Sequence, residues 1–112
     1  MREDGQLDYL ELPGGAIDDT KAFYSKAFGW TFQDYSPTYA AFNQGLDGGF
    51  DGDPEGVRTP LPVLFARDLD ALLIKIEAAG GVIVKPPFDF PGGRRFHFRD
   101  PAGNELAAWS EV

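Results

Sequence analysis

The chain has 112 residues, of which 43% are hydrophobic and 14% aromatic, enough to pack the core of one domain. Its net charge of -8 repels phosphate backbones, which makes nucleic acid a poor partner. The absence of cysteine excludes disulfides, zinc-thiolate sites and thiol nucleophiles. No run approaches the roughly 18 apolar residues that a membrane helix needs. We therefore expect a cytoplasmic protein that binds neither nucleic acid nor membrane.

The first half of the sequence predicts a strand, a helix and three further strands. Leu7–Leu12 suits the first strand. The helix is expected over residues 19–28, because Asp18 or Asp19 can cap its start and Gly29 provides a left-handed stop. The strands that follow are expected at Trp30–Tyr35, Tyr39–Asn43 and Leu46–Phe50.

The second half repeats this order. Asp68 is the expected cap of a second helix, which ends at Gly80-Gly81. Its apolar stripe consists of Leu69, Leu72, Leu73, Ile76 and Ala79. The strands of this half are expected at Leu61–Ala66, Val82–Val84, Arg95–Arg99 and Glu105–Trp109, with Pro86-Pro87 interrupting the last sheet.

The repeated order indicates a duplicated βαβββ unit. Gly29 and Gly80, which end the two helices, are 51 residues apart, nearly half the chain. One helix covers only one face of a sheet of about four strands, so the other face of each sheet stays bare. We expect an α+β fold in a single domain over residues 1–112. In it, two tandem modules, about 6–52 and 60–111, form curled mixed sheets around a cleft.

A turn motif near the C-terminus points to a family. Asp100-Pro101-Ala102-Gly103-Asn104 has the chemistry of a hairpin turn between two alternating runs. This motif, preceded by Phe98-Arg99 and combined with Phe23-Tyr24 and Phe28-Gly29-Trp30, resembles the glyoxalase/bleomycin resistance/dioxygenase superfamily, also called the vicinal oxygen chelate (VOC) superfamily. Within it, the likeness is to glyoxalase-like single-domain proteins, whose first strand reads like Glu11-Leu12-Pro13.

The resemblance implies where a metal site would be. Metal-dependent members place histidine and glutamate ligands on the first, fourth, fifth and last strands. Alignment puts Tyr9, Pro62 and Ala107 at three of these positions, and none of these side chains is a good ligand for a divalent cation. We therefore expect no metal in this chain and no cofactor.

Strand alternation selects the candidate ligand-binding residues. If Leu12 and Leu106 face the helices, then Tyr9, Glu11, Glu105 and Trp109 face the cleft, where aromatic rings stack on a ligand and carboxylates accept its hydrogen bonds. Aromatic residues also favour dimer interfaces, which is the alternative role of Tyr9 and Trp109. His97, the one histidine, faces either the cleft or solvent and is a candidate base or an incidental residue.

Three functions remain open from the sequence. The first is a metal-free binding protein, similar in plan to the bleomycin resistance proteins, that holds a small aromatic or cationic molecule as a homodimer. The second is a glyoxalase-like lyase or isomerase, which uses a divalent metal or acid-base chemistry of His97 with Glu11 or Glu105. The third is a protein-interaction module whose cleft is filled by a partner chain.

Overall fold

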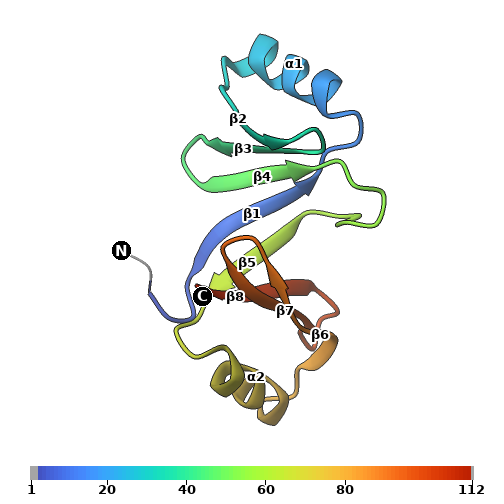
Figure 1. The fold of residues 1–112 in the computed structure, drawn as a ribbon. Helices are drawn as coiled ribbons and strands as arrows, with labels where there is room; N and C mark the ends of the chain where they lie inside the picture. Colours follow the sequence, from blue (N-terminus) through green and yellow to red (C-terminus); the bar gives the residue numbers. More distant parts are fainter. Residues whose placement is uncertain (1–2, 112) are drawn as a thin grey trace. The chain divides into compact units, whose positions relative to one another are not determined.

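The computed structural model describes residues 3–111, which form two helices and eight strands in two compact units. The N-terminal unit is Tyr9–Leu61, and the C-terminal unit combines residues 3–8 with residues 62–111. The element order is βαβββ twice, which confirms the predicted α+β fold class (Figure 1). Neither helix of the described residues has the length and apolar character that crossing a membrane requires.

The N-terminal unit packs one helix, α1 (Ile17–Phe28), on one face of a mixed sheet with the strand order β2-β3-β4-β1. Its strands are β1 (Leu7–Pro13), β2 (Gln33–Ser36), β3 (Tyr39–Asn43) and β4 (Asp47–Asp51). Strand β1 runs parallel to β4, and the other neighbouring pairs are antiparallel. The buried residues between helix and sheet are Ile17, Ala40, Phe42 and Phe50.

The start of α1 differs from the prediction. Its N-cap is Ala16, which provides no side-chain hydrogen bond, while Asp18 and Asp19 lie inside the first turn. Carboxylates there still interact favourably with the positive end of the helix dipole. The predicted stop is confirmed, because Gly29 adopts a left-handed conformation with φ 74°.

The strand predicted at Trp30–Tyr35 begins three residues later, at Gln33. Trp30 leaves the alternating pattern because its ring packs against two other rings. The centre of the Trp30 ring lies 4.8 Å from that of Tyr24, on which it stacks, and 5.0 Å from that of Phe42. The aromatic pattern of this segment therefore reflects packing in the core beneath α1 and not a strand.

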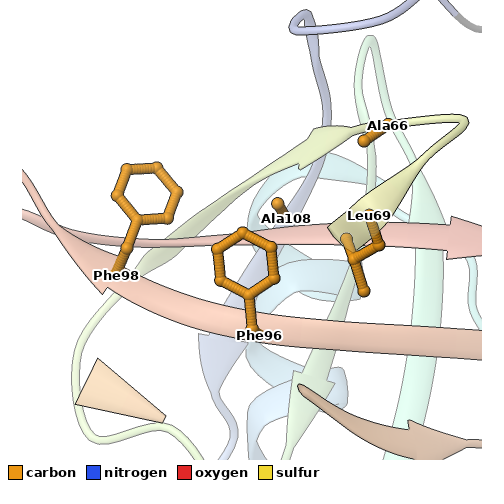
Figure 2. Close-up of a cluster of buried hydrophobic side chains, with 5 residues drawn as sticks. All are labelled: Ala66, Leu69, Phe96, Phe98 and Ala108. Atoms are coloured by element: carbon orange, nitrogen blue, oxygen red, sulfur yellow. The ribbon is translucent and has the colours of Figure 1, made fainter. Parts of the chain in front are cut away.

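The C-terminal unit repeats the plan with α2 (Leu69–Ala78) on a sheet with the strand order β5-β8-β7-β6. Its strands are β5 (Leu61–Phe65), β6 (Val82–Phe90), β7 (Gly93–Arg99) and β8 (Glu105–Glu111). Strand β5 is parallel to β8, and the hairpin strands β6, β7 and β8 are antiparallel. Figure 2 shows the buried cluster of this unit, which consists of Ala66, Leu69, Phe96, Phe98 and Ala108.

Strand β6 is longer than predicted, because it continues through Pro86-Pro87 as far as Phe90. The prolines are tolerated because β6 is the last strand in the order of this unit. Within the described residues of the unit, no further strand lies beside it that would need the backbone N–H groups that proline lacks. Its pairing with β7 nevertheless shifts register twice, between Ile83 and Lys85 and between Lys85 and Phe88. The prolines thus interrupt the ladder without ending the strand.

The predicted hairpin turn between β7 and β8 is confirmed. Asp100 accepts hydrogen bonds from the backbone N–H of Asn104 at 2.9 Å and from its side-chain amide at 3.0 Å. Gly103, with φ 91°, supplies the left-handed residue of the turn. The bonds from Asn104 hold the pKa of the exposed Asp100 carboxyl below its ordinary value.

The residues just before β1 belong to the C-terminal unit and bond to β5 and the residue pair that follows it. The N–H of Gly5 donates to the carbonyl of Phe65 at 2.8 Å, and the N–H of Phe65 donates to the carbonyl of Gln6 at 3.1 Å. Asp4 accepts a bond from the N–H of Arg67 at 2.7 Å. The boundary between the units therefore falls inside β1, after Asp8.

The cap of α2 gives a first testable prediction. Asp68 accepts a hydrogen bond from the N–H of Ala71 at 3.0 Å, as the sequence predicts. Asp68→Ala is expected to lower the free energy of unfolding by about 1 kcal/mol in urea denaturation, because one N–H of the first turn loses its partner. Asp18→Ala is the matched control and is expected to change it by less than about 0.5 kcal/mol. Equal losses in the two variants would contradict the assignment.

Candidate functional site

The predicted site residues of the C-terminal unit lie on the sheet face that carries no helix. Leu106 and Ala108 pack toward α2, as the sequence predicts, and their neighbours Glu105 and Trp109 therefore lie on the opposite face. His97 shares this helix-free face, because the phenylalanines on either side of it belong to the core under α2.

In the N-terminal unit, Tyr9 and Glu11 occupy the helix-free face of β1, while Leu12 packs against the core beneath α1. The five predicted residues thus form two groups, one in each unit.

The group in the N-terminal unit is a hydrogen-bonded chain of Tyr9, Tyr39 and Glu11, here called the tyrosine cluster. The two hydroxyls are 2.5 Å apart, and Tyr39 donates to Oε1 of Glu11 at 3.2 Å. Glu11 is buried, with 4% of its surface exposed. A buried carboxylate requires such donors, because removing a charge from water without them costs several kcal/mol.

Both tyrosines of this cluster stay neutral near pH 7. Burial raises the pKa of Tyr39 above its ordinary value, and the negative charge of Glu11 adds to the effect. Burial also raises the pKa of Tyr9, which the bond to Tyr39 only partly offsets. Each phenol therefore acts as a hydrogen-bond donor and acceptor, and neither supplies a phenolate.

Tyr39 is a site residue that the sequence reasoning missed. Its ring lies over Gly49, where a Cβ atom would come within 2.5 Å of Cζ of Tyr39. The sequence of β4 contains a sign of this contact. Two adjacent glycines in a five-residue strand indicate that another group approaches the backbone closely. Tyr39 also alternates with Ala40 and Phe42 of the core, which places it on the helix-free face.

The group in the C-terminal unit, here called the histidine cluster, consists of Phe88, Arg95, His97 and Glu105. His97 is buried, with 4% of its surface exposed, and its Nδ1 is 2.9 Å from Oε2 of Glu105. The ring of Phe88 lies 5.9 Å from the imidazole, and the guanidinium of Arg95 lies 5.5 Å from the centre of the Phe88 ring. Nε2 of His97 is buried and has no hydrogen-bond partner.

The imidazole of His97 is neutral near pH 7. Burial lowers the pKa of His97, and the positive charges of Arg95 and Lys85 act in the same direction, while Glu105 opposes them. The contact with Glu105 is therefore a hydrogen bond from a neutral imidazole and not an ion pair. Since an ionised carboxylate only accepts, Nδ1 carries the proton and Nε2 presents its lone pair.

This lowered pKa predicts the direction of a pH effect on stability. The unfolded chain binds a proton at His97 near pH 6.5, whereas the folded chain resists protonation there, so stability falls as the pH drops below about 6.5. We expect the free energy of unfolding, measured in urea at pH 7.5 and pH 5.5, to decrease toward the lower pH. In His97→Gln, which does not titrate, this decrease should shrink. An unchanged pH slope would contradict the neutral buried imidazole.

Trp109 belongs to the same face but has its own partners. Its Nε1 donates to both carboxylate oxygens of Asp8, at 3.0 and 3.3 Å. Its ring lies 5.5 Å from Phe65 and 6.2 Å from Phe90. The helix-free face of the C-terminal unit thus combines several aromatic rings with a few directed polar groups, the composition typical of small-molecule sites.

The residues that the resemblance puts at the family's metal positions do not fit a divalent metal. Tyr9 is a neutral phenol bonded to Tyr39, and Ala107 is buried between its strand neighbours Val63 and His97 without any ligand atom. Pro62 likewise offers no side-chain donor. Within residues 3–111, no group of three or more histidine, aspartate and glutamate side chains is placed to hold a metal ion.

A surface hollow of about 340 Å³ lies elsewhere, on the N-terminal unit. Its lining comes from the start of α1 and from β2 and includes Lys21 and Asp34, whose charged groups pair at 2.7 Å. It contains none of the predicted site residues. Its polar lining and exposed ion pair are typical of solvated surface, and it lacks the aromatic rings of the two clusters.

Comparison with known proteins places this geometry in context. A family model described as the glyoxalase/bleomycin resistance protein/dioxygenase superfamily matches residues 6–108. The anthracycline biosynthesis protein DnrV of Streptomyces peucetius is 33% identical over 94% of this chain. The match covers 46% of DnrV, so the chain spans less than half the length of that relative.

Solved structures share the fold. The Mn(II)-bound glyoxalase from Novosphingobium aromaticivorans is 26% identical with a TM-score of 0.70, and the match covers 100% of this chain and 40% of that one. The NAD-dependent benzaldehyde dehydrogenase from Legionella pneumophila reaches a TM-score of 0.78 over 93% of this chain and 98% of that one. At 17% identity, this second likeness concerns the fold alone.

Proposed function

Because the chain belongs to the glyoxalase/bleomycin resistance protein/dioxygenase superfamily, we propose that it binds a small aromatic or cationic molecule without the usual metal site. The side chains proposed to bind the ligand lie on the helix-free face of the sheet within each unit. The residues proposed for this role are Tyr9, Glu11, His97, Glu105 and Trp109.

The observation that carries this proposal is the position of the buried ionisable groups. Among the described residues, Glu11 and His97 are the charged or titratable side chains buried to this degree, and both lie on helix-free faces beside aromatic rings. A fold stabilised only by its cores gains nothing from ionisable groups there, since their burial costs free energy. Buried polar groups among rings are typical of a site that recognises a ligand.

A thermal-shift screen tests the proposal. The panel consists of planar aromatic compounds that are neutral, acidic or cationic, and it includes an anthracycline because DnrV is described as an anthracycline biosynthesis protein. A ligand at roughly a hundredfold above its Kd stabilises the folded state by about 2.7 kcal/mol, which raises Tm by several degrees. No shift with any member of the panel would contradict the proposal.

A pair of variants localises the ligand. Trp109→Leu removes a large ring and a donor from the helix-free face of the C-terminal unit and is expected to weaken binding. Phe23→Leu changes an exposed ring on α1 and should leave binding unchanged. Equal effects of the two substitutions would argue against the proposed location.

A catalytic function is the second candidate, favoured by the 2.9 Å hydrogen bond between His97 and Glu105. A neutral imidazole oriented by a carboxylate is the arrangement of a general base, as a glyoxalase-like lyase or isomerase would need. Supporting evidence would be exchange of solvent deuterium into a carbonyl compound that is lost in His97→Gln. A stoichiometric divalent metal in protein purified without chelators would instead favour metal-dependent chemistry and contradict the metal-free proposal.

We also propose that the protein is a homodimer, as single-domain members of the family are expected to be. Light scattering at micromolar concentration should give twice the mass of the chain, and the mass of a monomer would contradict this. The cytoplasmic location and the alternative of a protein-interaction module stay predictions from the sequence.

A further inference from the structure

We infer that the histidine cluster recognises the hydroxyl group of an aromatic ligand, of the phenol or naphthol class, through Nε2 of His97. This inference rests on the proposed function and names the ligand class within it. The hydroxyl donates its hydrogen bond to Nε2, and the aromatic ring of the ligand lies beside Phe88.

The hydrogen bond to Glu105 makes Nε2 an acceptor. Because Nδ1–H of His97 donates its hydrogen bond to the Glu105 carboxylate at 2.9 Å, the neutral imidazole has no second proton to donate. A ligand carbonyl, ether or carboxylate finds no donor at this nitrogen, whereas an O–H group does. The buried lone pair otherwise stays without a partner, which is unfavourable in the interior.

The charges around His97 favour a hydroxyl over a cation. Lys85 pairs with His97 in the register between β6 and β7, and its ammonium lies 5.1 Å from the centre of the Phe88 ring. Arg95 approaches the same ring from β7 at 5.5 Å. The positive charges of Arg95 and Lys85 act on this imidazole together with the negative charge of Glu105, and a ligand oxygen with partial negative charge is stabilised beside the two cations.

The ligand reaches Nε2 beside the Phe88 ring. Phe88 follows Pro86-Pro87 on the stretch of β6 where the pairing with β7 changes register. A ring on an interrupted ladder can shift without breaking a regular series of hydrogen bonds. The Phe88 ring, whose centre lies 5.9 Å from that of the imidazole, provides the aromatic surface for the ligand.

Three matched probes test the inference by isothermal titration. They are 2-naphthol, its methyl ether 2-methoxynaphthalene, and 2-naphthylmethylammonium, which share two fused rings and differ in the polar group. We expect the naphthol to bind at least about tenfold more tightly than the ether, because only it donates to Nε2. Equal affinity of naphthol and ether, or tighter binding of the ammonium, overturns the inference and leaves the proposed function intact. No binding of any probe, nor of the wider panel, overturns both.

A variant and a spectrum complete the test. In His97→Leu the naphthol should lose its advantage over the ether, whereas Glu77→Gln, exposed on α2, should keep it. Should His97→Leu fail to fold, histidine labelled with ¹⁵N gives a direct readout in the wild-type protein, since the chain has a single histidine. We expect a protonated Nδ1 and an unprotonated Nε2 whose signal shifts with naphthol and not with the ether. A protonated Nε2 overturns the inference.

Discussion

Phe96→Ala is expected to lower the free energy of unfolding by about 3–5 kcal/mol, a large part of the stability of a domain of this size. Phe96 is fully buried on β7, where its ring packs in the cluster with Leu69 and Ala108 under α2 (Figure 2). Truncation removes the transfer free energy of the ring and leaves a cavity that the surrounding strands fill only partly.

Urea denaturation measures this loss of stability, and two further variants serve as comparisons. Phe23→Ala removes an equally large side chain from an exposed position on α1 and should cost less than about 1 kcal/mol. Phe96→Leu keeps an apolar side chain in the cluster and should cost about 1.5 kcal/mol, so that the order can be measured even if the alanine variant unfolds. A loss in Phe96→Ala no larger than that in Phe23→Ala would contradict the assigned core face.

Gly49→Ala is expected to cost about 2–4 kcal/mol, although it adds only one methyl group. The new Cβ would meet the hydroxyl of Tyr39 and lie 2.5 Å from its Cζ, so the ring must leave its position over β4. Its departure breaks the bonds to Tyr9 and Glu11 and leaves a buried carboxylate short of a donor.

A double-mutant cycle isolates the cause of this loss. In a Tyr39→Ala background the ring is absent, and the same Gly49→Ala substitution should cost less than about 0.5 kcal/mol. If the losses in free energy of unfolding are additive, Gly49 is needed for the conformation of β4 itself and not because the Tyr39 ring packs against it.

The fold could be predicted because its signals are local. The stripe on α2 and the cap at Asp68 follow helical geometry, and the turn at Asp100 follows from residue chemistry alone. The errors arose where tertiary context overrides local preference. Strand β6 passes through Pro86-Pro87 because no further strand of its unit needs the missing donors, which a single strand's sequence does not reveal.

For the site, the alternation of side chains along each strand predicts which residues share a face, but not which of them are in contact. Alternation identified His97 and Glu105, but it did not reveal that they share a hydrogen bond, because that depends on the register between β7 and β8. Tyr39 was missed for a similar reason. Its partners are far away in sequence, and its position depends on a glycine of the neighbouring strand.

The most direct test of the account is a titration of 2-naphthol into protein that has been stripped of metal by EDTA, with and without added Mn²⁺. We expect the same affinity in both conditions, since the proposed site holds the ligand through His97 and the aromatic rings beside it. Binding that appears only after Mn²⁺ is added would contradict the central claim that this chain recognises its ligand without a metal.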